Sequence, residues 1–113
     1  MKEIKAIIRP FKLLDVSEAL KDIEGLPGVN VSEIKGFGKG RAASAKDKVV
    51  YEMVEFVPRI QLELVVNDEM VDAVVNVIQE YAHTGNPGDG KIFVSNIEEI
   101  VKIRTNERGR DAI

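Results

Sequence analysis

The chain has 113 residues, 44% of them hydrophobic and 31% charged, with a formal net charge of -3. These proportions are typical of one globular domain, and the acidic balance argues against a dedicated nucleic-acid binder, which would be strongly basic. The sequence has no cysteine and one histidine, His83. Thiolate chemistry is therefore excluded, and histidine-based metal clusters or Ser/His triads are poorly supplied. No apolar run approaches the roughly 18 residues that span a bilayer, so we expect a cytoplasmic protein.

The first half of the chain predicts a strand, a helix and a second strand. Residues 2–9 are rich in β-branched side chains and partly alternate, as in a strand. Apolar residues at helical spacing predict a helix over about 13–24, and the glycines and proline of residues 25–28 end it. Residues 29–38 alternate again and suit a half-buried strand.

The second half repeats this order. Residues 59–66 alternate cleanly between apolar and polar side chains, which predicts a strand. Asn67 and Asp68 favour the start of a helix, whose apolar stripe extends to Ala82. Residues 91–97 predict a fourth strand, and the last residues are ambiguous between a turn, a short strand and a polar tail.

The order βαββαβ predicts a ferredoxin-like α+β fold. In this fold a four-stranded antiparallel sheet carries both helices on one face. We assign Ala6, Val31 and Val65 to the other face. Because these side chains are apolar, we expect that face to be buried against other subunits.

A long segment without periodicity, residues 39–50, lies between the halves. It is rich in lysine, alanine and serine, and its basic residues outnumber its one acidic residue, Asp47. Loops of this length are uncommon in compact domains and are usually functional or mobile.

Three segments combine glycines with cations: residues 35–41, 84–91 and 102–110. Glycine lets backbone N–H groups approach a phosphate, and lysine or arginine supplies positive charge. None of the segments has the spacing of a Walker A loop. The alternative that each is an ordinary turn with solvated cations remains open. His83, at the end of the second helix, suits the helix dipole better than catalysis.

Together these segments resemble the PII family of nitrogen signal-transduction proteins over essentially the whole chain. The stretch "AIIRPFKLLDVSEAL" is similar to the family's opening, and "VDAVVNVIQEYAHTGNPGDGKIFV" and "IRTNERGRDAI" resemble its later signatures. The resemblance implies a single-domain subunit of a homotrimer with adenine-nucleotide sites between subunits. Three loops would build each site: a T-loop (about 38–53), a B-loop (about 83–91) and a C-terminal loop (about 102–113).

The resemblance also implies roles for individual residues. The B-loop backbone and Lys91 would hold the phosphates, and Arg104 of the neighbouring subunit would reach them. Lys102 stands where the family usually has an arginine, and Arg59 where it has a lysine. The nucleotide-binding residues carried over by matching position are Ile8, Gly36, Phe37, Gly38, Lys39, Arg59, Glu63, Leu64, Val65, Thr84, Gly88, Asp89, Gly90, Lys91, Phe93, Lys102 and Arg104.

The T-loop departs from the family pattern. Gly40 replaces a glutamine used in Mg²⁺–ATP-dependent 2-oxoglutarate binding, and glycine offers no side-chain carbonyl to a metal, which argues against that mode. The modified tyrosine position aligns with Glu52, so we expect no uridylylation, although an alignment shift of one residue would restore Tyr51. The residues expected to contact a partner are Arg41, Ser44, Lys46, Lys48 and Tyr51.

The function expected from the resemblance is that of a non-enzymatic regulator. It would bind ATP or ADP, with or without Mg²⁺, and contact a membrane transporter or cytosolic enzyme through the T-loop. We expect no metal site of its own and no direct binding to nucleic acid. Two alternatives remain: a slow ATPase using Lys91 and Arg104, and a structural trimer related to the CutA-type metal-tolerance proteins.

Overall fold

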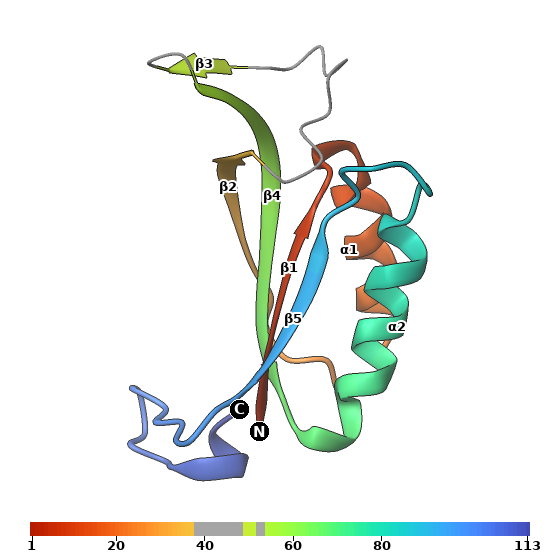
Figure 1. Ribbon diagram of the computed structural model, residues 1–113. Coiled ribbons are helices and arrows are strands. Elements are labelled where there is room, and N and C mark those ends of the chain that lie inside the picture. Colours follow the sequence, from red (N-terminus) through yellow and green to blue (C-terminus); the bar gives the residue numbers. More distant parts are fainter. Residues whose placement is uncertain (38–48, 52–53) are drawn as a thin grey trace.

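The computed structural model describes residues 1–37, 49–51 and 54–113. Four antiparallel strands, in the order β2-β4-β1-β5, form the main part of its sheet, and a short fifth strand, β3, pairs with β4. Both helices cover one face of this sheet (Figure 1), which confirms the ferredoxin-like prediction. The strands and helices are β1 (Lys2–Ile8), α1 (Leu13–Lys21), β2 (Asn30–Gly36), β3 (Val49–Tyr51), β4 (Val54–Val66), α2 (Val71–Ala82) and β5 (Lys91–Asn96), with 3-10 turns η1 (Pro10–Lys12), η2 (Asp68–Met70) and η3 (Gly109–Ala112).

Two elements differ in length from their predictions. Helix α1 ends at Lys21 rather than near residue 24, because the backbone N–H of Ile23 already bonds to the carbonyl of Leu20 in a tighter 3-10 pattern. Strand β4 begins at Val54, well before residue 59, and its first residues pair with the short strand β3. The sheet therefore extends into a segment whose residues show no strand periodicity.

The core lies between the sheet and the two helices. Ile4, Ile8, Leu62 and Ile78 are among its fully buried side chains. They come from alternate positions of β1 and β4 and from the inner stripe of α2. Full burial of a side chain of this size stabilises a fold by about 1.5–3 kcal/mol.

The predicted assignment of residues to the open face was wrong for two of three positions. Ala6 and Val31 both pair in register with Leu62, so they share the face that the helices cover. Ala6 is fully buried there, whereas Val31 lies on the edge strand β2 and is half exposed. Val65 does lie on the open face, because its neighbours Leu64 and Val66 are buried on the other side.

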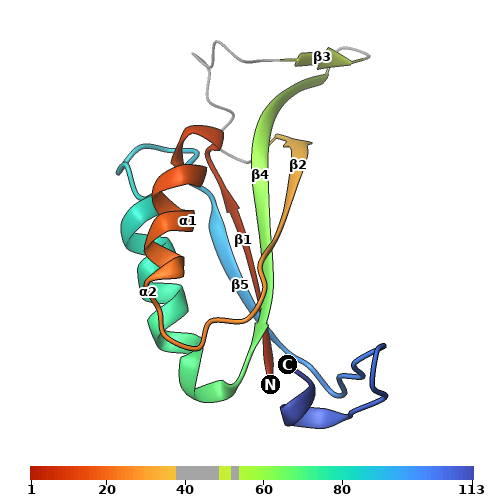
Figure 2. The ribbon, with the colours of Figure 1, turned by 180° about the vertical axis from the view of Figure 1, so that it is seen from behind.

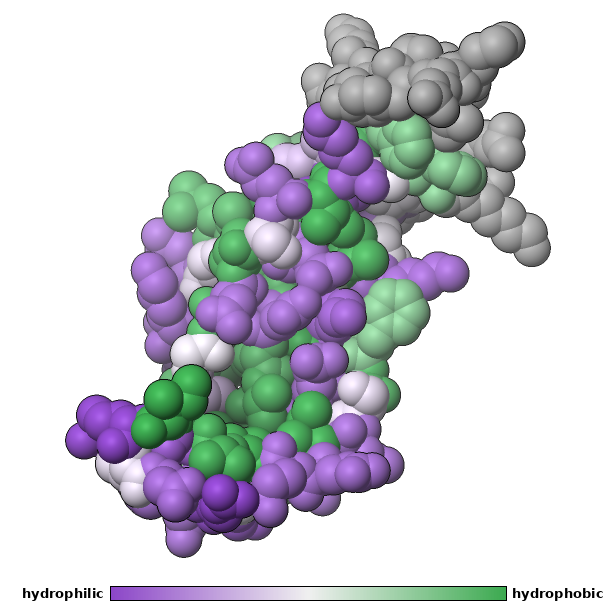
Figure 3. All heavy atoms as spheres, turned by 90° about the vertical axis from the view of Figure 1, so that its left-hand side faces the viewer, coloured by the Kyte–Doolittle hydropathy of each residue, from purple (hydrophilic) through white to green (hydrophobic). Residues whose placement is uncertain are grey.

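The open face of the sheet lies on the side away from the two helices (Figure 2), and Figure 3 looks onto that side. Apolar side chains gather in the lower middle of this face, with hydrophilic ones around them (Figure 3). Residues Ile7, Val65 and Phe93 belong to it by the alternation of their strands, and Phe93 is 50% exposed. A face of mixed character with an apolar centre suits an interface better than free solvent.

Two loops lie at opposite ends of strand β5. The loop between α2 and β5 is at one end of the sheet, and the segment after β5 folds back on itself at the other (Figure 1). An isolated bridge between Val101 and Arg108 closes that C-terminal segment. Within the described part of the chain, none of the helices combines the length and the apolar character that a membrane span needs.

Candidate functional site

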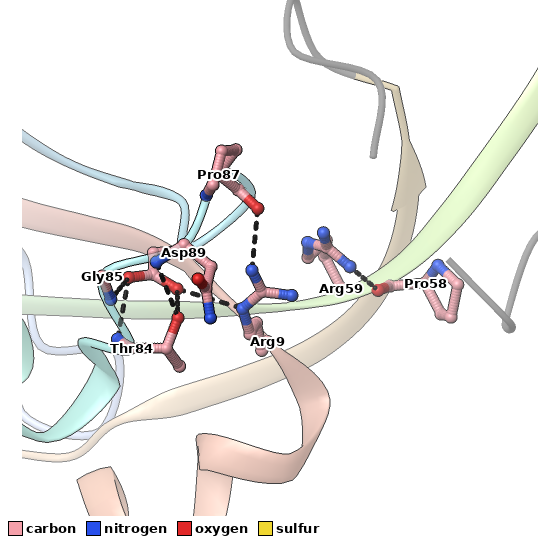
Figure 4. A network of polar contacts seen from close by, with 8 residues as sticks. Arg9, Pro58, Arg59, Thr84, Gly85, Pro87 and Asp89 are labelled. Atoms are coloured by element: carbon pink, nitrogen blue, oxygen red, sulfur yellow. Dashed lines mark hydrogen bonds and ion pairs between the residues drawn. The ribbon is translucent and has the colours of Figure 1, made fainter. Parts of the chain in front are cut away.

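The loop between α2 and β5 is organised by one carboxylate, that of Asp89. Its oxygens accept hydrogen bonds from the backbone N–H groups of Thr84 and Gly85, each at 2.8 Å, and from the Thr84 hydroxyl (Figure 4). The Thr84 oxygen in turn accepts from the backbone N–H of Asn86 at 3.1 Å. The loop is therefore held in shape from inside before any ligand arrives.

These contacts also set the charge state of Asp89. Partial burial disfavours the carboxylate, but the hydrogen bonds from Thr84, Gly85 and Arg9 outweigh it and hold its pKa well below the ordinary value. Asp89 is therefore ionised at neutral pH, and its charge is satisfied by groups of the loop and of β1.

Arg9 belongs to this candidate site, although no pattern in the sequence pointed to it. It follows β1, and its Nε donates to Asp89 Oδ1 at 3.0 Å while its Nη2 donates to the Pro87 carbonyl at 2.8 Å. Both partners of this ion pair are mostly buried, with side chains 18% and 22% exposed. One guanidinium thus holds the loop at two points, the Asp89 carboxylate and the Pro87 carbonyl, to the end of β1.

Two glycines of the loop occupy positions that no other residue would fill without strain. Gly88 and Gly90 have φ of 100° and 97°, in the region that favours glycine. A Cβ on Gly90 would lie 1.7 Å from the carbonyl oxygen of Ile7, and one on Gly88 would lie 3.2 Å from Arg9 and 3.1 Å from Arg59. The loop backbone therefore packs directly on β1 and borders two guanidinium groups.

The exposed side of this loop suits an anion. Within the part of the chain that the structure describes, the backbone N–H groups of Gly88 and Asp89 donate no hydrogen bond. Lys91 follows at the first position of β5 and is exposed. Arg59, on β4, uses its Nη1 for the Pro58 carbonyl at 2.8 Å, and its guanidinium points towards the loop (Figure 4). Backbone donors and two cations thus lie at the same end of the sheet.

The predicted residues of the strands divide between the two faces. Ile8 and Leu64 have side chains buried in the core, so only their backbones could meet a ligand. Glu63, Val65 and Phe93 lie on the open face, and Gln61 donates a hydrogen bond to Glu63. The open face therefore presents apolar surface together with a carboxylate.

The base of the predicted T-loop is described only in part. Gly36 is the last residue of β2, and the ring of Phe37 packs edge-to-face on Phe56 of β4 with centroids 5.5 Å apart. Tyr51 lies in β3. The other predicted residues of this loop lie outside the described residues: Gly38, Lys39, Gly40, Arg41, Ser44, Lys46, Lys48 and Glu52.

Lys102 and Arg104 do not join the loop within one chain. They lie in the C-terminal segment, beyond the far end of β5, whereas Lys91 begins that strand (Figures 1 and 2). The strand alone separates its ends by about 17 Å at the usual rise per residue. One phosphate group could therefore not touch both clusters in a single subunit.

A small hollow beside the loop also falls short of a complete site. It lies between the end of α2 and the start of β5, is lined by Ile78, His83 and Lys91 among others, and has a volume of about 210 Å³. Ligand pockets usually enclose about 300–1,000 Å³. This hollow alone would not enclose a nucleotide.

The fold and the loop define a class: ferredoxin-like proteins with an anion-suited glycine loop before the last strand. A family model described as nitrogen regulatory protein P-II matches residues 1–107. The chain is 50% identical to the nitrogen regulatory protein P-II of Rhodospirillum rubrum, 49% to that of Rhizobium meliloti and 48% to that of Bradyrhizobium diazoefficiens, in each case over 113 residues and the whole of both chains. The chain therefore belongs to the PII family of nitrogen regulatory proteins.

Proposed function

We propose that this protein is a trimeric, non-enzymatic regulator that binds ATP or ADP in clefts between its subunits and acts in the cytoplasm. The observation that carries the proposal is the loop before β5, where the backbone N–H groups of Gly88 and Asp89 donate no hydrogen bond to any described residue and lie at the same end of the sheet as Lys91 and Arg59. Its relatives are named as regulatory proteins.

Phosphate is the chemical group that best matches this loop. Successive backbone N–H groups at glycine form an anion-binding nest, and lysine adds a point charge at its exit. Asp89 does not oppose the anion strongly, because Arg9 and three hydrogen bonds from Thr84 and Gly85 already compensate its charge. A polyphosphate would therefore meet donors rather than a bare carboxylate.

A second subunit would complete the site. Lys102 and Arg104 supply further cations, but they lie at the opposite end of the sheet from Lys91 (Figure 1). In a closed ring of three, the C-terminal segment of one subunit can approach the loop of the next. The apolar centre of the open sheet face, which includes Val65, would be buried in the same assembly.

The bound nucleotide would be reported to a partner through the T-loop. Strands β2 and β4 both lead from the site into that loop, and the packing of Phe37 on Phe56 joins their ends. A nucleotide that binds one loop arrangement better shifts the population towards it. We propose a membrane transporter or a cytosolic enzyme as the partner.

Calorimetric titration with ATP, ADP and AMP, on protein whose mass in solution is measured by light scattering, tests this function. We expect a trimer that binds ATP and ADP, and a loss of affinity of at least about tenfold in Lys91→Ala, the range for one charge-assisted contact to a phosphate. Lys21→Ala, on the exposed side of α1, is the matched control. A verified trimer that binds none of the nucleotides would contradict the proposal.

A further inference from the structure

Both ends of the chain meet at the turn η2, which joins β4 to α2. The amino group of Met1 donates to Asp68 at 2.7 Å, and Arg110 of the C-terminal segment forms an ion pair with Glu69. Ala112, two residues after Arg110, is buried. The root of the C-terminal segment is therefore attached next to η2.

The rest of the C-terminal segment is bonded mainly to itself. Lys102 donates its backbone N–H to the Glu107 carbonyl at 2.9 Å, and its ammonium lies 3.7 Å from the Glu107 carboxylate. Thr105 and Asn106 bond back to Lys102, which closes the tip of the turn. The hairpin is thus an ordered unit, but its internal bonds do not determine its position on the body.

The ion pair between Arg110 and Glu69 is the specific link to the body. Among the described residues, it is the one polar side-chain contact from residues 101–113 to any residue before Val101. Lys102 and Arg104 lie in the other part of the hairpin, away from this ion pair, and Ile103 between them is 99% exposed. The direction in which the two cations are presented therefore depends on how firmly the root is held.

We infer that Glu69 and Arg110 form a latch that positions the C-terminal hairpin, so that Lys102 and Arg104 meet the nucleotide of the adjacent subunit. This inference rests on the proposed function and adds a regulation to it. A hairpin held in its binding position loses less entropy when the phosphates arrive, which raises affinity without a new contact to the ligand. Glu69 and Arg110 are positioning residues in this account.

The size and salt dependence of the effect follow from the exposure of the pair. The two side chains are 62% and 55% exposed, and exposed ion pairs of this kind change an equilibrium by about 1.5- to fivefold. Salt screens such a pair, because the Debye length shortens from about 10 Å at 0.1 M to about 3 Å at 1 M. Nucleotide affinity should therefore fall as salt is added for two reasons. Salt weakens the ion pair between Glu69 and Arg110, and it screens the phosphates directly.

A competing role for Arg110 predicts the opposite sign in one variant. If Arg110 bound phosphate directly, Glu69 would hold it back, and Glu69→Gln would release the arginine and raise affinity. If Arg110 is a latch, Glu69→Gln lowers affinity. The sign of this single change separates the two roles.

The experiment titrates ATP into the wild-type trimer and into Glu69→Gln, Arg110→Gln, the double variant and the reversed pair Glu69→Arg/Arg110→Glu. We expect each single change to weaken binding by about two- to fivefold, the double to weaken it no further, and the reversed pair to recover most of the loss. Asp72→Asn is the matched control, because Asp72 is an exposed acidic residue of the first turn of α2, close to η2. Its affinity should equal that of the wild type.

Each outcome decides a different statement. A wild-type trimer that binds no nucleotide overturns the proposed function and this inference with it. A wild type that binds, with Glu69→Gln unchanged or tighter, overturns the latch alone. Additive losses in the double variant, or no recovery in the reversed pair, also contradict it, since partners of one contact must be coupled.

Discussion

The two charged regions at the ends of β5 are held in different ways. In the loop before the strand, the carboxylate of Asp89 is mostly buried and accepts hydrogen bonds from Thr84, Gly85 and Arg9. Arg9 also attaches the loop to the end of β1. In the segment after the strand, the ion pair of Arg110 with Glu69 is more than half exposed. The first region is held by buried polar contacts to the sheet, and the second by an exposed ion pair.

This difference suggests a division of work in the proposed site. A preorganised loop binds phosphate with little loss of entropy and little change of shape. A weakly attached hairpin can adjust to a neighbouring subunit. Salt or a partner can then change the nucleotide affinity of the site without disturbing the core. Substitutions in the loop should therefore affect the stability of the fold, whereas substitutions in the C-terminal hairpin should affect binding alone.

Gly90→Ala should have the largest effect on the loop. The new Cβ would overlap the carbonyl oxygen of Ile7, so β5 must shift away from β1. The alanine backbone would also have to adopt a positive φ, which L side chains rarely do. We expect a loss of at least about 3 kcal/mol in the free energy of unfolding, measured with urea. Gly28→Ala is the control, since nothing lies within 4 Å of its Cβ position. Equal stability of the two variants would mean that the loop does not pack on β1 as described.

Asp89→Asn should have the next largest effect, and one that depends on pH. The folded-state pKa of Asp89 lies below its ordinary value of 3.8. Its contribution to stability is therefore complete above that value and is lost as the pH falls below it. We expect a loss of about 1–3 kcal/mol at about pH 7, where a charged acceptor is removed, and a smaller difference from wild type at about pH 3.

The pH dependence provides the check on Asp89→Asn. Urea unfolding of both proteins across this range measures the difference directly. Asp15→Asn, on the exposed first turn of α1, should run parallel to the wild type. A stability difference between Asp89→Asn and wild type that stays constant with pH would show that the carboxylate is not held ionised by Arg9 and Thr84.

Arg9→Lys should have the smallest effect of the three. A lysine can keep one contact, to Asp89 or to the Pro87 carbonyl, but it lacks the planar group that reaches both. We expect a loss of about 1 kcal/mol in unfolding free energy, with ATP affinity weakened about two- to tenfold. Arg108→Lys, in the C-terminal hairpin, should leave stability unchanged. If Arg9→Lys matches the wild type in both measurements, Arg9 does not position the loop.

Much of the fold could be predicted from the sequence, because the periodicities are strong. The alternation in residues 59–66 and the stripe of α2 predict the right elements, and their order predicts the ferredoxin-like topology. The assignment of Ala6 was wrong because alternation fixes which residues share a face but not which face the helices cover. A shift of one residue reverses every side chain of a strand.

The candidate site was predicted unevenly. The glycines and Lys91 are adjacent in the sequence, so their combination was visible as a phosphate-suited loop. Arg9 lies 80 residues from Asp89, and a cation at the end of a strand is ordinary by itself. Only the register of β1 with β5 brings it to the loop. Glu69 and Arg110 were missed for the same reason, since nothing local relates the two.

The most direct test of the central claim, a nucleotide site shared between subunits, is complementation in mixed trimers. Lys91→Ala and Arg104→Ala chains are purified separately, each as a homotrimer with weakened ATP binding, then unfolded together and refolded. If the site combines Lys91 of one subunit with Arg104 of the next, random mixing restores about a quarter of the sites to wild-type affinity, as a head-to-tail ring requires. If the mixed trimers bind no better than the two homotrimers, the site is not shared, and the account is contradicted.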